Sequence, residues 1–514
     1  MPAPTPDREL VIFQNWSADA ICVGPATEAA LALPVSNAAP PDPALVALNR
    51  FGLGARPGDE LGKVAADARG CLKTELKQPD IALVSADDSK NAGLLDGTAA
   101  IQASMAAAAE RKAARGEKAA PAMQPATDAP DSSADAKNKP VVPPVEADIY
   151  RDEAQARFDK AINAGPGFVE RLVGFWSNHF CVSAAKGQIV RACAGAFERE
   201  AIRPFVLGRF ADMLLAVEHH PAMLFYLDNQ QSIGPDSRAG KRRGRGLNEN
   251  LAREILELHT MGVGSGYAQA DVTSFAGMLT GWTMAGREGR LGEPGSFVFN
   301  ANAHQPGKAV LLGKTYPDGG MGQAEAALND IARHPATARH IAGKLACHFI
   351  ADEPPPRSVA HLAEVFTKTD GDLHALALAL IDMTEAWSMP LTKLRAPFDY
   401  VVAVRRAIGP PAGNEPQRTL RWLRALGEPL WQPPGPNGFP DRTDNWASAE
   451  GLKTRLDIAW QAAKQADDIG NPSDMLSTLI GASASAETRE AIARAESRQQ
   501  GLALLLMAPE FQRR

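Results

Sequence analysis

The spacing of apolar residues is the feature that most constrains the fold of this chain. From Asp148 to the C-terminus, apolar residues recur mostly at intervals of three and four, as in helices that bury one face. Strand-like runs are few, and only residues 296–299 and 309–312 suit one short hairpin around the loop of His304. We therefore expect an all-α fold, a large multi-helix globular domain with at most one short β-hairpin.

Composition divides the chain into four parts. Residues 1–42 are rich in proline and alanine, and we expect an irregular arm. A first helical unit of the core follows over residues 43–96, and the main helical domain spans residues 148–514. Between them lies a low-complexity insertion, residues 97–147. Its first half, to Lys118, is expected to be helical, and its second half offers too little apolar surface to fold.

Charge and cysteine content exclude several classes of protein. The net charge of −6 provides no basic surface for nucleic acid. The five cysteines include no C-x-x-C pair, which argues against a disulfide framework and a cysteine zinc site. No secretory signal and no run of about 18 apolar residues is found, so we expect a cytoplasmic protein without a transmembrane segment. The sequence does not determine a cofactor, a metal or the oligomeric state.

Residues 247–262 form the segment that carries the most chemistry. One helical stripe of about 80° is formed by Leu247, Leu251, Ile255 and Leu258. A neighbouring arc of about 100° holds Asn250, Arg253, Glu254 and Glu257. Two carboxylates three residues apart, beside an amide, can bind a metal or transfer protons, so Asn250, Glu254 and Glu257 are catalytic candidates. The same residues also suit an ion-pair network with a neighbouring helix, which is the commoner arrangement.

Two histidines bear on this site. His179 lies in an aromatic segment and is the fourth catalytic candidate, with a packed histidine as the alternative. His259 lies about 140° from Glu254 around the helix, so the two do not share a small site unless the helix breaks. We expect His259 to be a hydrogen-bonded interface residue.

A basic segment suggests one place where an anion could bind. Residues 238–245 hold five cations, of which Arg242, Arg243 and Arg245 are the candidates for contact with an anionic ligand, a lipid headgroup or an acidic partner. A solvated mobile loop is the alternative interpretation.

Two further residues are candidates for ligand binding. Arg339 falls just inside the apolar face of the predicted helix that begins at Pro335, so we expect it to be buried beside Glu254 or Glu257. His304 lies in a polar loop, and loops on rigid scaffolds often carry function. On the helix of Arg339, Lys344 and His348 lie at the opposite edge of the apolar face. No phosphate-binding loop, G-x-S-x-G elbow, H-E-x-x-H or dinucleotide fingerprint is present.

Several short motifs together resemble the bacterial domain-of-unknown-function 1800 family. Their order and spacing match from about Ala44 to the C-terminus, apart from an insertion over residues 97–145. The motifs are L-N-R-F-G at 48–52, W-S-N-H-F at 176–180, H-P-A-M at 220–223, residues 248–262, T-G-W at 280–282, H-P-A-T-A at 334–338 and the ending at 504–514.

The resemblance implies a partner but no activity. Members of the family are often encoded beside a protein of the domain-of-unknown-function 1501 family, which is similar to sulfatases and alkaline phosphatases. We therefore predict a binding or assembly partner of a sulfatase-like protein. The alternative is a hydrolase, metal-assisted or not, built on Glu254 and Glu257.

Two positions depart from the pattern of the family. Ala268 stands where the family usually has Thr, so a helix cap worth about 1 kcal/mol is lost. Gln305 stands where an Asp is common, so a His–Asp pair at His304 is not expected.

Overall fold

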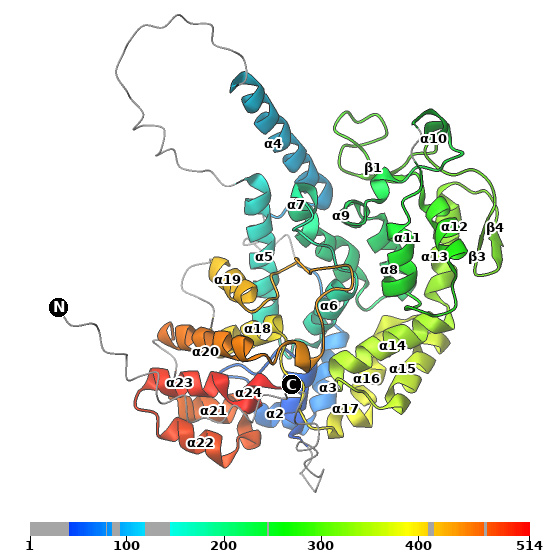
Figure 1. Cartoon of the computed structure of the whole chain (residues 1–514). Helices are drawn as coiled ribbons and strands as arrows, with labels where there is room; N and C mark the ends of the chain where they lie inside the picture. The colour runs from blue at the N-terminus through cyan, green and yellow to red at the C-terminus, as the bar shows by residue number, and fades with distance from the viewer. Residues whose placement is uncertain are drawn as a thin grey trace, which may run out of the picture.

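The computed structural model describes residues 41–78, 80–84, 93–118, 144–243, 246–409, 416–466 and 470–514. Helices form nearly all of the regular structure (Figure 1), which confirms the all-α prediction. In the first half the elements are α1 (Pro43–Leu45), η4 (Val46–Phe51), α2 (Leu61–Ala66), α3 (Ala68–Leu76), α4 (Gly97–Lys118), α5 (Val145–Asn163), α6 (Phe168–His179), α7 (Gln188–Phe197), η6 (Glu198–Ile202), η7 (Arg203–Phe205), α8 (Phe210–His219), α9 (Pro221–Tyr226), η8 (Asn229–Gln231), α10 (Arg238–Arg243), α11 (Asn250–Glu254) and η9 (Ile255–His259).

Two groups of helices can be distinguished in the second half of the chain. Helices α14, α15 and α16 lie side by side, and α20 to α24 form a separate group at the base of the view in Figure 1. The elements are α12 (Gln269–Leu279), α13 (Met321–Ala332), α14 (Pro335–Phe349), α15 (Pro356–Lys368), α16 (Leu373–Asp382), α17 (Thr384–Ser388), α18 (Pro397–Ile408), α19 (Gln417–Ala425), η10 (Thr443–Asn445), α20 (Ala449–Lys464), α21 (Pro472–Leu479), η11 (Gly481–Ser483), α22 (Ala486–Ala493), α23 (Arg498–Met507) and α24 (Pro509–Gln512).

Proline and histidine together start two of these helices. In α9 and α14 proline occupies the first turn, where its missing N–H costs nothing. The histidine before each proline caps the helix: Nδ1 of His220 accepts from the backbone N–H of Ala222, and Nδ1 of His334 accepts from that of Ala336, both at 3.1 Å. The two H-P-A motifs are therefore helix starts.

Two helical segments change along their length. After α7 the chain turns at Pro204 and continues as α8, because proline has no N–H to donate to a helical hydrogen bond. The segment after Asn248 begins as α11 and changes to a π-helix over Ile255–His259. It ends at His259, and Gly262 follows with a φ of 90°, a backbone conformation that favours glycine.

The strands pair differently from the predicted hairpin. β1 (Trp282–Met284) pairs with β2 (Phe297–Phe299), and β3 (Ala309–Leu311) pairs with β4 (Lys314–Tyr316), both antiparallel. The predicted partners 296–299 and 309–312 thus belong to two separate two-stranded sheets. The strand-like runs are strands, and the run at 309–311 pairs with β4, which follows it directly and costs less chain entropy to reach. The partner of β2 is β1, although β3 is nearer to β2 in sequence.

One large core joins distant parts of the chain. Its buried apolar residues run from Val46 to Phe511. The ring of Phe51 lies 5.3 Å from that of Phe168 and 6.1 Å from that of Phe349, so η4, α6 and α14 meet there. No helix among the described residues is long and apolar enough to cross a membrane.

The start of α12 shows the helix cap that Ala268 leaves incomplete. The carboxylate of Asp271 accepts from the backbone N–H of Ala268 at 2.8 Å, but Ala268 offers no side-chain oxygen in return. Ala268 is exposed and has extended backbone angles that suit threonine. We expect Ala268→Thr to complete the capping box and to raise the free energy of unfolding by about 0.5–1 kcal/mol. A urea titration measures this change, and a loss of stability would contradict the assignment.

Candidate functional site

A cavity of about 280 Å³ lies between α5, α6, α14, the start of α18 and a proline-rich segment. We define the proline-rich segment as residues 428–441, which lie between α19 and α20. In Figure 1 it is the orange trace that leaves α19, crosses in front of α6 and returns to α20. The cavity is therefore assembled from parts of the chain that are far apart in sequence.

Hydrogen bonds attach the proline-rich segment to the end of α6. The side chain of Asn178 donates to the carbonyl of Phe439 at 2.9 Å and accepts from its backbone N–H at 2.8 Å. Gly438 has a φ of 76°, and a Cβ there would lie 2.5 Å from the carbonyl oxygen of Asn178, so glycine is required at this contact. Prolines stiffen the segment, so these few bonds are enough to hold it over the cavity.

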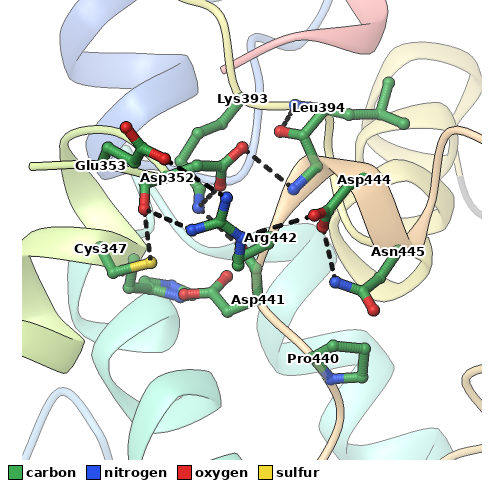
Figure 2. Close-up of polar contacts among 12 residues, drawn as sticks. Cys347, Asp352, Glu353, Lys393, Leu394, Pro440, Asp441, Arg442, Asp444 and Asn445 are labelled. Atoms are coloured by element: carbon green, nitrogen blue, oxygen red, sulfur yellow. Dashed lines mark hydrogen bonds and ion pairs between the residues drawn. The ribbon is translucent and has the colours of Figure 1, made fainter. Parts of the chain in front are cut away.

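A second set of contacts holds the end of this segment and the residues that follow it (Figure 2). The carboxylate of Asp352 accepts from Nζ of Lys393 at 2.6 Å and from the backbone N–H of Thr443 at 3.1 Å. Lys393 also donates to the carbonyl of Asp441 at 2.7 Å, and Arg442 donates to the carbonyl of Asp352. This clamp fixes the position of the Asp441 carboxylate at the cavity wall.

The attachment can be tested at Asn178. Asn178→Ala removes both bonds to Phe439 and leaves the backbone groups of that residue unpaired. We expect a loss of about 1–3 kcal/mol in the free energy of unfolding and faster hydrogen exchange at the Phe439 amide. Asn163→Ala is the control, because the Asn163 amide bonds only a carbonyl of its own helix. Equal effects in the two variants would contradict the attachment.

Two ion-pair clusters line the cavity. In the first, Asp399 binds Arg171 at 3.0 Å and Arg514 at 3.1 Å, and Asp441 binds Arg514 at 3.2 Å and Nδ1 of His348 at 2.9 Å. Burial raises the pKa of Asp441, but the hydrogen bond with His348 and the charges of Arg514 and Lys393 outweigh it, so the carboxylate stays ionised. Burial lowers the pKa of His348 to about 4, so its imidazole is neutral at physiological pH.

The second cluster lies behind the cavity wall. Arg203 binds Glu170 at 2.8 Å and Glu198 at 2.9 Å, and Arg157 binds Glu198 at 2.7 Å. The side chains of Arg203 and Glu198 are 1% and 2% exposed, so their charges are compensated by the ion pairs of this cluster and not by solvent.

Lys344 is a cation without such compensation. Its only hydrogen bond runs from Nζ to Nδ1 of His179 at 2.9 Å, and no carboxylate of the described residues lies within ion-pair distance. Burial lowers the pKa of Lys344 to about 8. The pKa of His179 falls well below its usual value, first through burial and then through Lys344, so the imidazole is neutral.

Glu428 is the acidic counterpart. One oxygen accepts from the backbone N–H of Phe398 at 2.8 Å, and no cation of the described residues pairs with the group. Burial raises the pKa of Glu428 to about 8, so the carboxyl is largely protonated at neutral pH. Among the charged side chains that line the cavity, Lys344 and Glu428 are the two that have no oppositely charged partner in the described residues.

Thiol and metal chemistry have no support in the described residues. Cys181 lines the cavity, but burial raises the pKa of its thiol to about 12, and Sγ donates to the carbonyl of Pro436. No three His, Cys, Asp or Glu side chains of the described chain are grouped so that they could hold a metal ion.

The structure separates the four predicted catalytic residues. His179 lines the cavity. Asn250 contacts the carbonyl of Leu227, and Glu257 pairs with Arg253 at 3.5 Å, as in the ion-pair alternative. Glu254 is half-buried without a hydrogen-bond partner among the described residues, and burial raises its pKa, but it does not line the cavity.

Arg242, Arg339 and His304 do not line the cavity either. Arg242 is exposed on α10, which is a short helix and not a loop; Arg243 ends that helix, and Arg245 lies outside the described residues. The expected burial of Arg339 is wrong: it is exposed and has no ion pair within the described chain, because the edge of the apolar face where it lies is not covered. His304 is buried, and its Nδ1 bonds the carbonyl of Thr280 at 2.9 Å.

His259 is a hydrogen-bonded interface histidine, as predicted. Its Nδ1 lies 2.7 Å from a carboxylate oxygen of Glu218, with both side chains buried.

Sequence reasoning missed Lys344, His348, Glu428 and Asp441 as site residues. Lys344 and His348 are four apart on one edge of α14, which is a recognisable signal for a shared location. Glu428 and Asp441 are the ends of a segment that contains five prolines, and a long segment of this kind between helices is often functional. Neither pair could be connected to the other without the tertiary structure.

The protein has a predominantly helical fold with a cavity that is lined by charged side chains. The family model described as protein of unknown function (DUF1800) matches residues 46–513, which is nearly the whole chain. The protein therefore belongs to this family, as its motifs indicated. No curated protein matches it, and no solved structure does.

Proposed function

We propose that the protein is an enzyme that performs acid–base chemistry on a small molecule in the central cavity. Glu428 is the proton donor, and Lys344 stabilises negative charge that develops on the substrate. One observation carries this proposal: Lys344 and Glu428 lack charged partners within the described chain, whereas the other charged groups of the cavity are paired. A buried charge without a partner costs stability, and a group in a cleft whose pKa is strongly shifted is a candidate for a functional role.

Hydrolysis is the reaction class that these two groups serve most directly. A protonated carboxyl can protonate a leaving group, and an ammonium can stabilise an oxyanion. The hydrolase alternative drawn from Glu254 and Glu257 thus keeps its reaction class, but the proposed residues are Glu428 and Lys344.

A panel of chromogenic carboxylic, phosphate and sulfate esters tests the proposal. We expect the full chain to turn over at least one class, Glu428→Gln and Lys344→Met to lose this turnover, and Glu254→Gln to keep it. No turnover across the panel, or turnover that survives Glu428→Gln, would contradict the proposal. Loss in Glu254→Gln alone would instead support the carboxylate pair.

Assembly with a sulfatase-like protein is the second candidate. It is supported by α10, where Arg238, Lys241 and Arg242 are exposed and have no carboxylate partner among the described residues. Such a patch suits an acidic protein surface. We expect co-purification with the sulfatase-like protein at low salt and its loss when these three cations are changed to glutamate. No association at low salt would contradict this candidate.

A further inference from the structure

The ammonium of Lys344 is held in place by a chain of fixed groups. Nε2 of His179 lies 3.0 Å from the backbone carbonyl of His259, which can only accept, so this nitrogen carries the proton. Nδ1 of His179 must then accept from Lys344. The backbone of His259 is fixed in turn because its ring is bound to the buried carboxylate of Glu218. Lys344 therefore uses one N–H on His179 and has two others to donate.

Among the charged side chains that line the cavity, one positive charge is left without compensation by a described residue. Arg171 is paired with Asp399, and Arg157 with Glu198. Arg514 shares Asp399 and Asp441, and His348 is neutral on Asp441. Lys344 has no such partner, so a ligand with a single negative charge would complete the balance. A dianion would carry one negative charge more than Lys344 can balance, and this second charge would be buried without compensation.

The other walls of the cavity are apolar and limit the size of the ligand. They are formed by Leu53, Phe175, Val182, Phe398, Leu430 and Phe439. A cavity of about 280 Å³ suits a small molecule and excludes a polymer segment.

We propose that the cavity binds a small apolar molecule with one carboxylate group, and that Lys344 is the residue that holds the carboxylate. This inference deepens the proposed function, because it names the substrate class of the same cavity. The carboxylate accepts two N–H groups of Lys344, and the apolar body lies against the aromatic walls.

Calorimetric titration with matched ligands tests the inference. Acetate, benzoate and phenylacetate are each compared at pH 7 with the corresponding neutral amide, and phenyl phosphate serves as the dianion. We expect at least one carboxylate to bind at least about tenfold more tightly than its amide and than phenyl phosphate. Lys344→Met should remove this advantage. Lys453→Met, at an exposed surface lysine, should behave as the wild type.

Three outcomes would overturn the inference: no carboxylate that binds more tightly than its amide, tighter binding of phenyl phosphate, or an advantage that survives in Lys344→Met. If Lys344→Met does not fold, Glu428→Gln decides, because in that variant residue 428 no longer ionises near pH 8. The advantage of the carboxylate must still disappear there as the pH rises above about 8 and the ammonium of Lys344 loses its charge. Carboxylate binding without any turnover would contradict the proposed enzyme but not this inference. Turnover of esters without carboxylate selectivity would do the reverse.

Discussion

Arg203→Met should lower the free energy of unfolding by about 3–5 kcal/mol, because it removes the ion pair of the buried Glu170 carboxylate and one of the two ion pairs of Glu198. Arg203 contacts Glu170 and Glu198 together, and it also donates to the carbonyl of Ala82 at 2.7 Å. Methionine keeps most of the side-chain volume, so the loss of charge is the dominant change. Glu198 keeps its ion pair with Arg157, so the larger part of the cost comes from Glu170, which loses its ion pair.

The same substitution at the surface is the matched control. Arg209 pairs with Asp370 at 3.2 Å, but the two side chains are 52% and 46% exposed. Solvent screens such a pair, so Arg209→Met should cost less than about 1 kcal/mol. Urea titrations of both variants measure the difference. A cost for Arg203→Met as small as that for Arg209→Met would show that the second cluster does not stabilise the fold.

Glu428→Gln should reduce turnover by about 100-fold or more while raising stability at alkaline pH. Glutamine keeps the size and the acceptor for the backbone N–H of Phe398 but cannot give a proton. In the wild type, turnover should fall as pH rises above about 8, because the acid form of Glu428 is lost. Initial rates at fixed substrate concentration, measured for both proteins across this range, give the comparison.

Glu428→Gln should lose turnover but gain stability relative to the wild type at alkaline pH. The pKa of Glu428 is higher in the folded chain than its ordinary value of 4.5, so the folded state holds the proton more strongly. This contribution is complete below pH 4.5 and is lost as pH rises towards 8. We expect Glu428→Gln to be more stable than the wild type at pH 8 by about 1–3 kcal/mol, since glutamine never ionises. A variant that is both inactive and less stable would point to a structural role instead.

The sequence predicted the helices better than the site, for a physical reason. Helix positions follow from local spacing and caps, so α4, α9 and α14 were found where H-P-A motifs or alanine-rich runs predicted them. The breaks at Pro204 and Ile255 are harder to predict, because packing decides whether a helix continues. The pairing of the strands likewise depends on which neighbour is closest in three dimensions.

The candidate site depends on contacts that no local pattern contains. His179 was identified from its aromatic surroundings, but its partner Lys344 lies 165 residues further along the chain. The acid-rich face of residues 250–257 suggests a catalytic pair because its charges are close in sequence, but Glu257 is paired with Arg253 on the same helix. Lys344 and Glu428 matter because they have no charged partner, and that property is visible only once the neighbours of each residue are known.

The protonation state of Glu428 tests the central claim most directly. With the side-chain carboxyls of glutamate labelled with carbon-13, and with Glu428→Gln used to assign the signal, the titration of this single group can be followed by NMR. We expect a midpoint near pH 8, which is the behaviour of a buried carboxyl without a cationic partner. A midpoint near 4.5 would show that Glu428 is solvated or paired, and the cavity would then lack the proton donor that the proposed function requires.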